Sequence, residues 1–159
     1  FTPLEDATLL HVAAEFGHVE AVRTLLGLGV EVDAAAGLDA EGLGGHTPLF
    51  HTVNSNANRS AAVMELLLVA GAAPETFVRG LVWGRGFEWE TALFDLTPVS
   101  YAQCGLLPQM HRDARQIADV VRTLLARAGR AVPAMANVPN RYVVRSQQAT
   151  AGRTTPGDV

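Results

Sequence analysis

Three segments of the chain follow one plan, and this internal repetition constrains the fold more than any single motif does. The string VRTLL of residues 22–26 returns unchanged at 121–125. In each segment a threonine precedes a short stretch with helical spacing, a break follows, and a longer apolar stretch leads to a glycine. The three threonines are Thr8, Thr47 and Thr97. Because repeated units bury their apolar faces against their neighbours, the pattern predicts a stack of similar units.

Each unit is predicted to contain two helices. The threonine hydroxyls can cap the first helix, and Pro48 and Pro98 come next in two of the units, where the first helical turn tolerates a missing N–H. Gly17 is placed to end the first helix of unit one, and Gly29 and Gly71 are placed to end second helices.

The second helices carry the predicted core. Leucine pairs at 25/26, 67/68 and 124/125 recur at matching positions, so we expect them to face a shared interior. Of these, Leu25, Leu67 and Leu124 are expected to be buried between units. Asp113 followed by Gln116 is typical of a capping box at the start of the last helix.

At these residues the chain resembles the ankyrin repeat, whose pattern runs TPLH, AA, GH, V, LL and G at fixed spacing. Unit one matches it almost without gaps, and units two and three match it progressively less. The resemblance implies an all-α fold, a helical solenoid of stacked repeats with long β-hairpin-like fingers between them. It implies an ankyrin-repeat domain over residues 1–130, with repeats at about 5–37, 44–78 and 94–130. Residues 131–159 are expected to form an extended C-terminal tail.

The spacing between units departs from the family. Thr8 and Thr47 are 39 positions apart and Thr47 and Thr97 are 50 apart, whereas the family period is about 33. The extra residues fall at 34–46, at 74–96 and at 105–113. Insertions in repeat arrays form loops, often on the binding face.

The second insertion contains VWGRGFEW, residues 82–89, which holds both tryptophans of the chain. The stretch predicts a β-hairpin that turns at Gly84-Arg85-Gly86, with Trp83 paired across it with Phe87 or Trp89. A phosphate-binding glycine loop is disfavoured, because no third glycine, lysine or helix start follows. Two interpretations stay open: the aromatic residues cover the base of the finger, or one of them meets a partner. We expect Trp89 to be packed and Trp83 and Arg85 to be presented.

Composition excludes several classes of protein. Cys104 is the only cysteine, so no intrachain disulfide can form, which fits a reducing compartment and a cytoplasmic location. No apolar run is long enough to span a membrane. Residues 1–105 carry a net charge of −9 and residues 106–159 carry +5, which we interpret as two solvated faces. The chain begins with Phe, so we expect that its natural start was removed or lies further upstream.

The five histidines do not show the spacing of a metal site. By the resemblance, His11 corresponds to the histidine that hydrogen-bonds the capping threonine of its own repeat. Cys104 and His111 could be imagined as a nucleophilic pair, but nothing in the sequence brings them together. We therefore expect no catalytic residue, no metal and no cofactor.

The resemblance implies a protein–protein interaction module that is not an enzyme. It would bind a partner protein through the fingers and the concave face of the first helices, as a monomer, with no nucleic acid or membrane as partner. Two alternatives stay open: an accessory or regulatory domain of a larger, possibly enzymatic, chain, and a small-molecule pocket lined by Trp83, Trp89 and Tyr101. The predicted contact residues are Val12, Glu15, His51, Asn54, Trp83, Arg85, Phe87, Trp89, Tyr101 and Cys104.

Overall fold

The structure is a computed structural model that describes residues 6–88, 90–105 and 112–133. Trp89 and nearly all of the predicted tail lie outside these ranges. In chain order the elements are α1 (Leu9–Glu15), α2 (Val19–Gly27), α3 (Phe50–Val53), the 3-10 turn η1 (Asn56–Asn58), α4 (Ala61–Val69), β1 (Val78–Trp83), β2 (Thr91–Leu96), α5 (Pro98–Cys104) and α6 (Ala114–Arg127).

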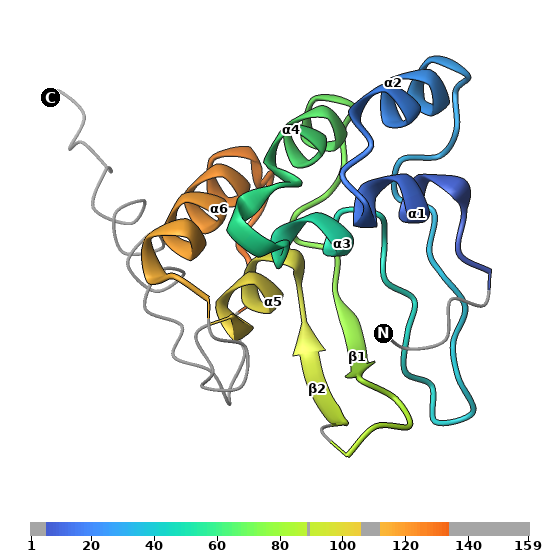
Figure 1. Cartoon of the computed structure of the whole chain (residues 1–159), viewed down its shortest axis with the longest axis vertical. Helices are drawn as coiled ribbons and strands as arrows, with labels where there is room; N and C mark the ends of the chain where they lie inside the picture. Colours follow the sequence, from blue (N-terminus) through green and yellow to red (C-terminus); the bar gives the residue numbers. More distant parts are fainter. Residues whose placement is uncertain (1–5, 89, 106–111, 134–159) are drawn as a thin grey trace, which may run out of the picture.

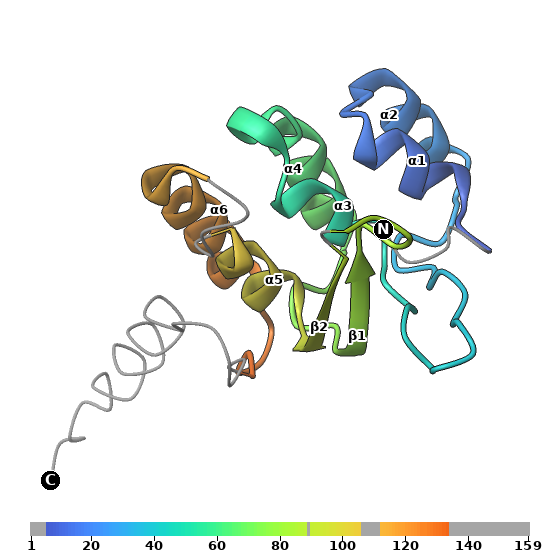
Figure 2. The same ribbon diagram turned by 60° about the horizontal axis from the view of Figure 1, so that its bottom comes forward.

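The helices form two rows. The shorter helices α1, α3 and α5 make one row, and the longer helices α2, α4 and α6 make the other, as Figure 1 shows. Neighbours within each row are in contact, and so are α1 with α2, α3 with α4, and α5 with α6. Figure 2 shows the three pairs side by side, with the strands extending away from the shorter row. We call the surface formed by α1, α3, α5 and the hairpin the inner face.

Local hydrogen bonds explain where α1 and α5 begin. The Thr8 amide donates to Nδ1 of His11 at 3.0 Å, and the Thr8 hydroxyl lies 2.9 Å from the same nitrogen. At α5 the Ser100 amide donates to the Thr97 hydroxyl at 3.1 Å, and the Thr97 amide donates to the Ser100 hydroxyl at 2.7 Å. These reciprocal bonds satisfy amides that a helix start leaves without partners. They confirm the predicted roles of Thr8, Thr97 and His11.

Two other predicted caps turn out differently. The Asp113 carboxylate accepts from the backbone amides of Arg115 and Gln116 and so caps α6. The Gln116 side chain does not bond back to the Asp113 amide, as it would in a capping box. The Thr47 hydroxyl is buried and has no hydrogen-bond partner among the residues described, and α3 begins only at Phe50. The prediction that Thr47 caps this helix is therefore wrong. Phe50 stands where unit one has His11, so no ring nitrogen is present there to complete the box.

The all-α prediction is wrong, because β1 and β2 form a two-stranded antiparallel sheet. The fold is mixed, predominantly helical with one hairpin. The register pairs Val78 with Leu96 and Trp83 with Thr91, so Trp83 does not pair with Phe87 or Trp89 as expected. The turn itself falls where glycines allow it, with φ of +68° at Gly84 and +83° at Gly86.

The hairpin belongs to the fold because its apolar residues reach the common core. Leu81 and Leu93 are 1% and 4% exposed and lie in one cluster with the helices. The connector 34–46 runs beside the hairpin, and the Gly44 amide donates to the Gly80 carbonyl at 2.9 Å. Two of the predicted insertions therefore pack against each other.

The helical core follows the leucine pairs. Leu67 and Leu124 are fully buried, as predicted, whereas Leu25 is only partly buried and packs against the edge of the cluster. The φ angles of Gly29 and Gly71, +78° and +100°, confirm their positions just past the ends of α2 and α4.

Candidate functional site

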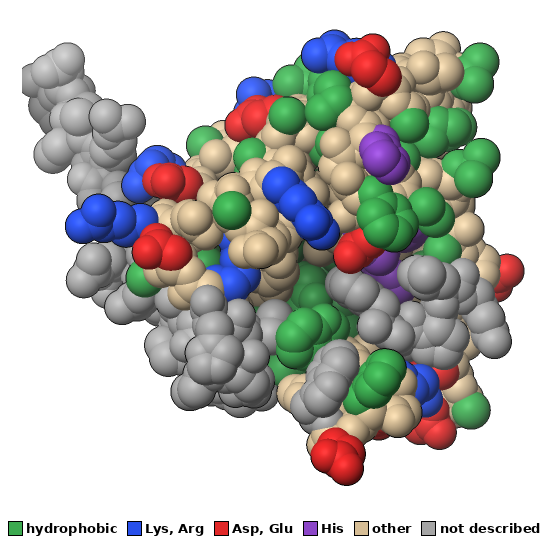
Figure 3. Space-filling model, viewed as in Figure 1, with side chains coloured by type: hydrophobic (Ala, Val, Ile, Leu, Met, Phe, Trp, Pro, Cys, Tyr) green, Lys and Arg blue, Asp and Glu red, His purple; other side chains and the backbone are tan. Residues whose placement is uncertain are grey.

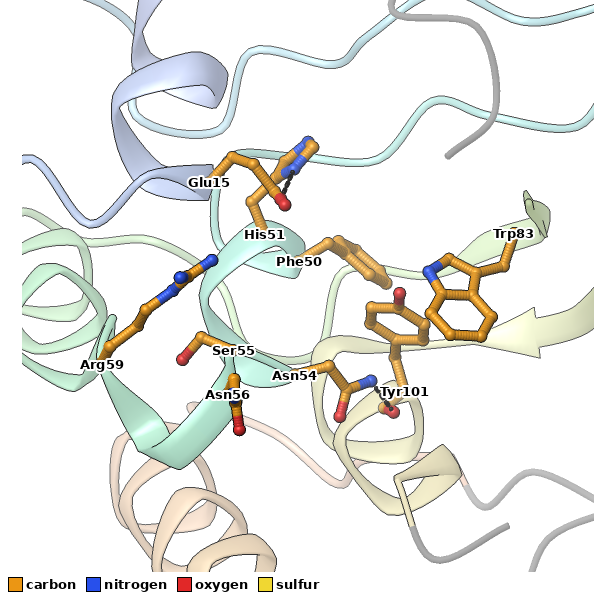
Figure 4. A pocket seen from close by; sticks show the side chains of 9 residues that line it. All are labelled: Glu15, Phe50, His51, Asn54, Ser55, Asn56, Arg59, Trp83 and Tyr101. Atoms are coloured by element: carbon orange, nitrogen blue, oxygen red, sulfur yellow. Dashed lines mark hydrogen bonds and ion pairs between the residues drawn. The ribbon is translucent and has the colours of Figure 1, made fainter. Parts of the chain in front are cut away.

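A pocket of about 250 Å³ opens on the inner face, between the row of short helices and the hairpin. It is lined by Glu15, Phe50, His51, Asn54, Ser55, Asn56, Arg59, Trp83 and Tyr101. Figure 4 shows these side chains arriving from α1, α3, the segment after α3, β1 and α5. In the space-filling view this face is hollowed between the helices and the hairpin, with hydrophobic side chains in the hollow (Figure 3). Five of the ten predicted contact residues line this one pocket.

The apolar wall of the pocket consists of aromatic rings. Phe50 and Tyr101 are buried, and their ring centroids lie 5.9 Å apart with the planes tilted by 42°. Burial raises the pKa of Tyr101, so its hydroxyl stays neutral at physiological pH. Trp83 is half-buried, and its indole nitrogen lies on the side of the ring that faces Tyr101 (Figure 4). The wall therefore combines apolar area with polar ring atoms.

The opposite side of the pocket is polar. Nδ1 of His51 lies 2.8 Å from Oε2 of Glu15, which ties α3 to α1. The amide of Asn54 donates to the Tyr101 carbonyl at 2.7 Å and ties α3 to α5. His51 and Asn54 were both predicted as contact residues, and each also holds two neighbouring helices together.

The Arg112 guanidinium lies directly behind Asn54. It donates to the Val53 carbonyl at 2.9 Å, to Oδ1 of Asn54 at 3.1 Å and to Oδ1 of Asn58 at 2.5 Å. Burial lowers the pKa of Arg112, yet a guanidinium stays protonated in proteins. All three acceptors are neutral oxygens, so its positive charge has no carboxylate partner among the residues described.

His51 of the pocket also meets two other buried histidines, a grouping that sequence spacing does not predict. The ring centroids of His11, His46 and His51 are 4.9 to 5.7 Å apart. His11 accepts from the Thr8 amide at Nδ1, and its Nε2 lies 3.0 Å from the His46 carbonyl oxygen. Since an amide can only donate and a carbonyl only accept, His11 is the neutral tautomer protonated at Nε2.

Burial lowers the pKa of His11 and lowers that of His46 to about 3, with further contributions from the neighbouring rings. Because both ring nitrogens of His11 are already engaged, this ring offers no lone pair to a metal. Within residues 6–88, 90–105 and 112–133 no group of His, Cys, Asp and Glu side chains is arranged to hold a metal ion.

The hairpin turn carries two further predicted residues. Arg85 forms an ion pair with Asp39 and lies 3.9 Å from Glu41, so it fastens the turn to the connector 34–46. Phe87 is 63% exposed beside it. The structure therefore engages Arg85 within the chain, where we expected it to be presented.

Two predicted residues lie away from the pocket lining. Val12 is exposed on α1 and lines a separate open groove between α1 and α2. Cys104 is fully buried; burial raises the pKa of its thiol to about 12, and its Sγ lies 3.5 Å from the Ser100 carbonyl oxygen. A thiol in this state is neither a nucleophile nor a contact group.

The sequence prediction missed Ser55, Asn56 and Arg59 at the pocket mouth. These residues belong to NSNANRS, residues 54–60, the longest polar run between the two helices of unit two. Such a run between apolar segments indicates a surface loop, and loops on a rigid scaffold often carry binding residues. The polar run of residues 54–60 could therefore have indicated these binding residues, but the repeat pattern alone assigns this stretch to a helix connection.

The comparison with protein families agrees with the fold. The model of the ankyrin repeat matches residues 5–36, which span α1, α2 and the start of the connector. The chain therefore carries one ankyrin repeat that the family model recognises, at residues 5–36. Ankyrin repeats are typically non-enzymatic domains that bind other proteins, so the match indicates a protein-interaction module. No curated protein matches the sequence. Among the helices of the described ranges, none has the length and apolarity needed to cross a membrane.

Proposed function

We propose that this chain binds a partner protein through its inner face, with the pocket between α1, α3, α5 and the hairpin as the centre of the contact. The observation that supports this is the pocket lining, which gathers aromatic, charged and amide side chains from α1, α3, the segment after α3, β1 and α5. Tryptophan, tyrosine and arginine are the residues that most often dominate the binding energy of protein interfaces. Trp83, Tyr101 and Arg59 all line this one pocket.

We further propose that the three helix pairs correspond to three repeats, at about 5–37, 44–78 and 94–130, with residues 131–159 as a tail. The reciprocal caps support this, because α1 and α5 use the same arrangement with His11 in one and Ser100 in the other. The inner face then consists of equivalent surfaces of consecutive units, and the hairpin is an insertion that closes one side of it.

The rigidity of the pocket supports a role in recognition. Phe50 and Tyr101 in its apolar wall are buried, and the Glu15–His51 and Asn54–Tyr101 bonds fix the helices that carry them. A site that is formed before binding loses little conformational freedom when the partner arrives. Phe87, which is 63% exposed in the turn of the hairpin, adds an exposed apolar side chain to the same hairpin.

Site-specific photo-crosslinking tests this proposal. A photoreactive amino acid is placed at Asn56, which is exposed at the pocket mouth, and in a second protein at Ala126, which is exposed on α6. In cells that make the protein, we expect a discrete crosslinked partner from position 56 only. Trp83→Ala should weaken that crosslink by about tenfold or more, as at an interface hot spot, while circular dichroism confirms that the helices persist. The same products from both positions, or none from position 56, would refute the proposal.

A further inference from the structure

The arginines that the structure describes fall into two groups, those with a carboxylate partner and those without one. Those with a carboxylate oxygen within ion-pair distance are Arg23, Arg85, Arg122, Arg127 and Arg130. Arg59 is different: it forms no ion pair and no side-chain hydrogen bond with any residue that the structure describes. Figure 4 shows its side chain reaching along the mouth of the pocket. A positive charge is therefore available where a ligand would enter.

Arg112 adds a second positive charge behind the pocket. Its guanidinium is half-buried and bonded only to neutral oxygens, one of them Oδ1 of Asn54, which lines the pocket. In this less polar surrounding the charge is screened less than it would be in water. The positive potential of Arg112 consequently reaches the pocket through Asn54.

Among the residues that the structure describes, one carboxylate lines the pocket, and it already has a partner. Glu15 lies 2.8 Å from the ring nitrogen of His51 and forms no ion pair with Arg59. A cationic ligand would have to compete with His51 for this carboxylate and would meet Arg59 and Arg112 as like charges. An anionic ligand would meet two cations, neither of which has a carboxylate partner among the described residues. The electrostatics of the pocket thus favour an anion.

Neutral donors and an apolar surface lie beside Arg59. Ser55 and Asn56 line the same side, and the Ser55 oxygen accepts from the Ser60 amide at 3.1 Å, which leaves its own proton available to donate. Across the pocket stands the half-buried ring of Trp83. A guanidinium with neighbouring hydroxyl and amide donors suits a carboxylate, and an indole face suits an apolar side chain.

We propose that this pocket recognises an acidic side chain of the partner, an aspartate or glutamate next to an apolar residue, with the carboxylate at Arg59 and the apolar side chain against Trp83. This inference rests on the proposed function, since it names the chemistry that the inner face selects. It also gives Arg112 a role beyond holding the loop, because its charge contributes to the attraction.

Three short peptides test the proposal with the whole chain in solution. The first is a capped six-residue peptide with Glu-Leu at its centre, and in the other two Gln or Lys replaces that Glu. Binding is followed by NMR on the ¹⁵N-labelled protein, using the indole signal of Trp83 and the guanidinium N–H signal of Arg59. We expect the Glu peptide to shift both signals and to bind about tenfold more tightly than the Gln peptide, the usual size of a charge-assisted hydrogen bond. Added salt should reduce this difference.

Two variants separate a specific site from general charge. Arg59→Gln should remove the preference for the Glu peptide. Arg115→Gln is the matched control, because Arg115 is also exposed and also has no carboxylate partner among the residues described, but lies on α6 outside the pocket. It should leave the preference intact. Equal losses in the two variants, or an unchanged preference in Arg59→Gln, would overturn the proposal.

The remaining outcomes distinguish this inference from the proposed function. Tighter binding of the Lys peptide at the Trp83 signal would overturn the anionic specificity and leave the inner face as a binding surface. Absence of peptide binding combined with a specific crosslink from position 56 would also overturn the anionic specificity and leave the inner face as a binding surface. Absence of both would overturn both proposals.

Discussion

Acidification should weaken this fold through His46, whose ring is fully buried between His11 and His51. Burial, together with the two neighbouring rings, lowers the pKa of His46 to about 3. An exposed histidine of an unfolded chain has a pKa of about 6.5. Between these two values the unfolded chain binds a proton at this position and the folded chain does not.

The sign follows from that difference. The stability that His46 contributes is present in full above pH 6.5 and is lost progressively as the pH falls toward 3. At pH 5 the loss amounts to about 2 kcal/mol. This pH lies about 1.5 units below the pKa of a histidine in the unfolded chain, and each unit of difference stabilises the unfolded state by about 1.4 kcal/mol through proton binding. His11, whose pKa burial also lowers, acts in the same direction. A loss of this size is a large part of the 5–15 kcal/mol that typically holds a domain folded.

Urea unfolding at pH 7.5 and at pH 5.0, followed by circular dichroism, measures the effect. His46 should contribute a loss of about 2 kcal/mol to the chain between the two values. His46→Gln is less stable at both values, but the difference between them should shrink by about 2 kcal/mol because the titrating group is gone. His18→Gln, which removes an exposed histidine at the start of α2, should leave the difference unchanged.

Asp33 works against His46, because burial raises its pKa and the folded chain therefore gains stability as this carboxyl takes up a proton. Asp33 is present in all three proteins, so its contribution cancels when their pH differences are compared. An equal loss of stability in His46→Gln and in the unaltered chain would show that His46 does not carry the effect and would refute the argument.

Three further predictions concern packing, capping and reactivity. Leu67→Ala should cost about 2–5 kcal/mol in urea unfolding, since the side chain is fully buried between helix pairs, whereas Leu28→Ala, at a position 76% exposed, should stay within about 0.5 kcal/mol. Thr97→Ala should cost about 1–2 kcal/mol, because it leaves the buried Ser100 amide without its acceptor; a change below about 0.3 kcal/mol would contradict the cap. Cys104 should react with a thiol reagent only at the rate of unfolding, since it is buried and its pKa is raised to about 12; rapid labelling of the folded chain would contradict this.

Helix starts and ends could be predicted because they depend on neighbours in the sequence. Thr8 with His11, and Thr97 with Ser100, are three positions apart, so their bonds form within one turn wherever the helix lies. Thr47 is the exception, and the reason is also local. With Phe50 three positions later, no side chain can return a bond to its amide, and α3 is only four residues long.

The hairpin shows the limit of local patterns. Its turn could be placed from the glycines, but the predicted pairing of Trp83 with Phe87 or Trp89 requires a strand directly after Gly86. The structure has further turn hydrogen bonds there: the Phe87 amide donates to the Gly84 carbonyl, and the Glu90 amide donates to the Phe87 carbonyl. The register is set by packing, because Leu81 and Leu93 pair with each other and both reach the core. A slip of one residue would turn these side chains to the solvent face, and no local signal reports that constraint.

The candidate site depends on contacts across units, which sequence spacing does not reveal. Spacing gave no reason to group His11, His46 and His51, because it addresses ligands on one element only. Packing of α1 against α3 and the connector brings the three rings together. The predicted contact residues Glu15, His51, Asn54, Trp83 and Tyr101 were placed on the inner face by analogy with the repeat, and whether they bind a partner stays a prediction.

Arg112 contributes both to the shape of the site and to its charge. The loop after α3 contains two non-glycine residues in the left-handed region, Ala57 at φ +50° and Asn58 at +52°, a conformation that costs of the order of 1 kcal/mol each. Arg112 offsets this cost by donating to Val53, Asn54 and Asn58 at once, and the Asn58 amide donates in turn to the Gln116 carbonyl at 3.0 Å. The loop is thereby held so that its next side chain, Arg59, reaches the pocket mouth. A neutral donor in place of Arg112 could hold the loop but would leave the pocket with half of its positive charge, so a guanidinium at this position suits an anionic partner better than stability alone requires.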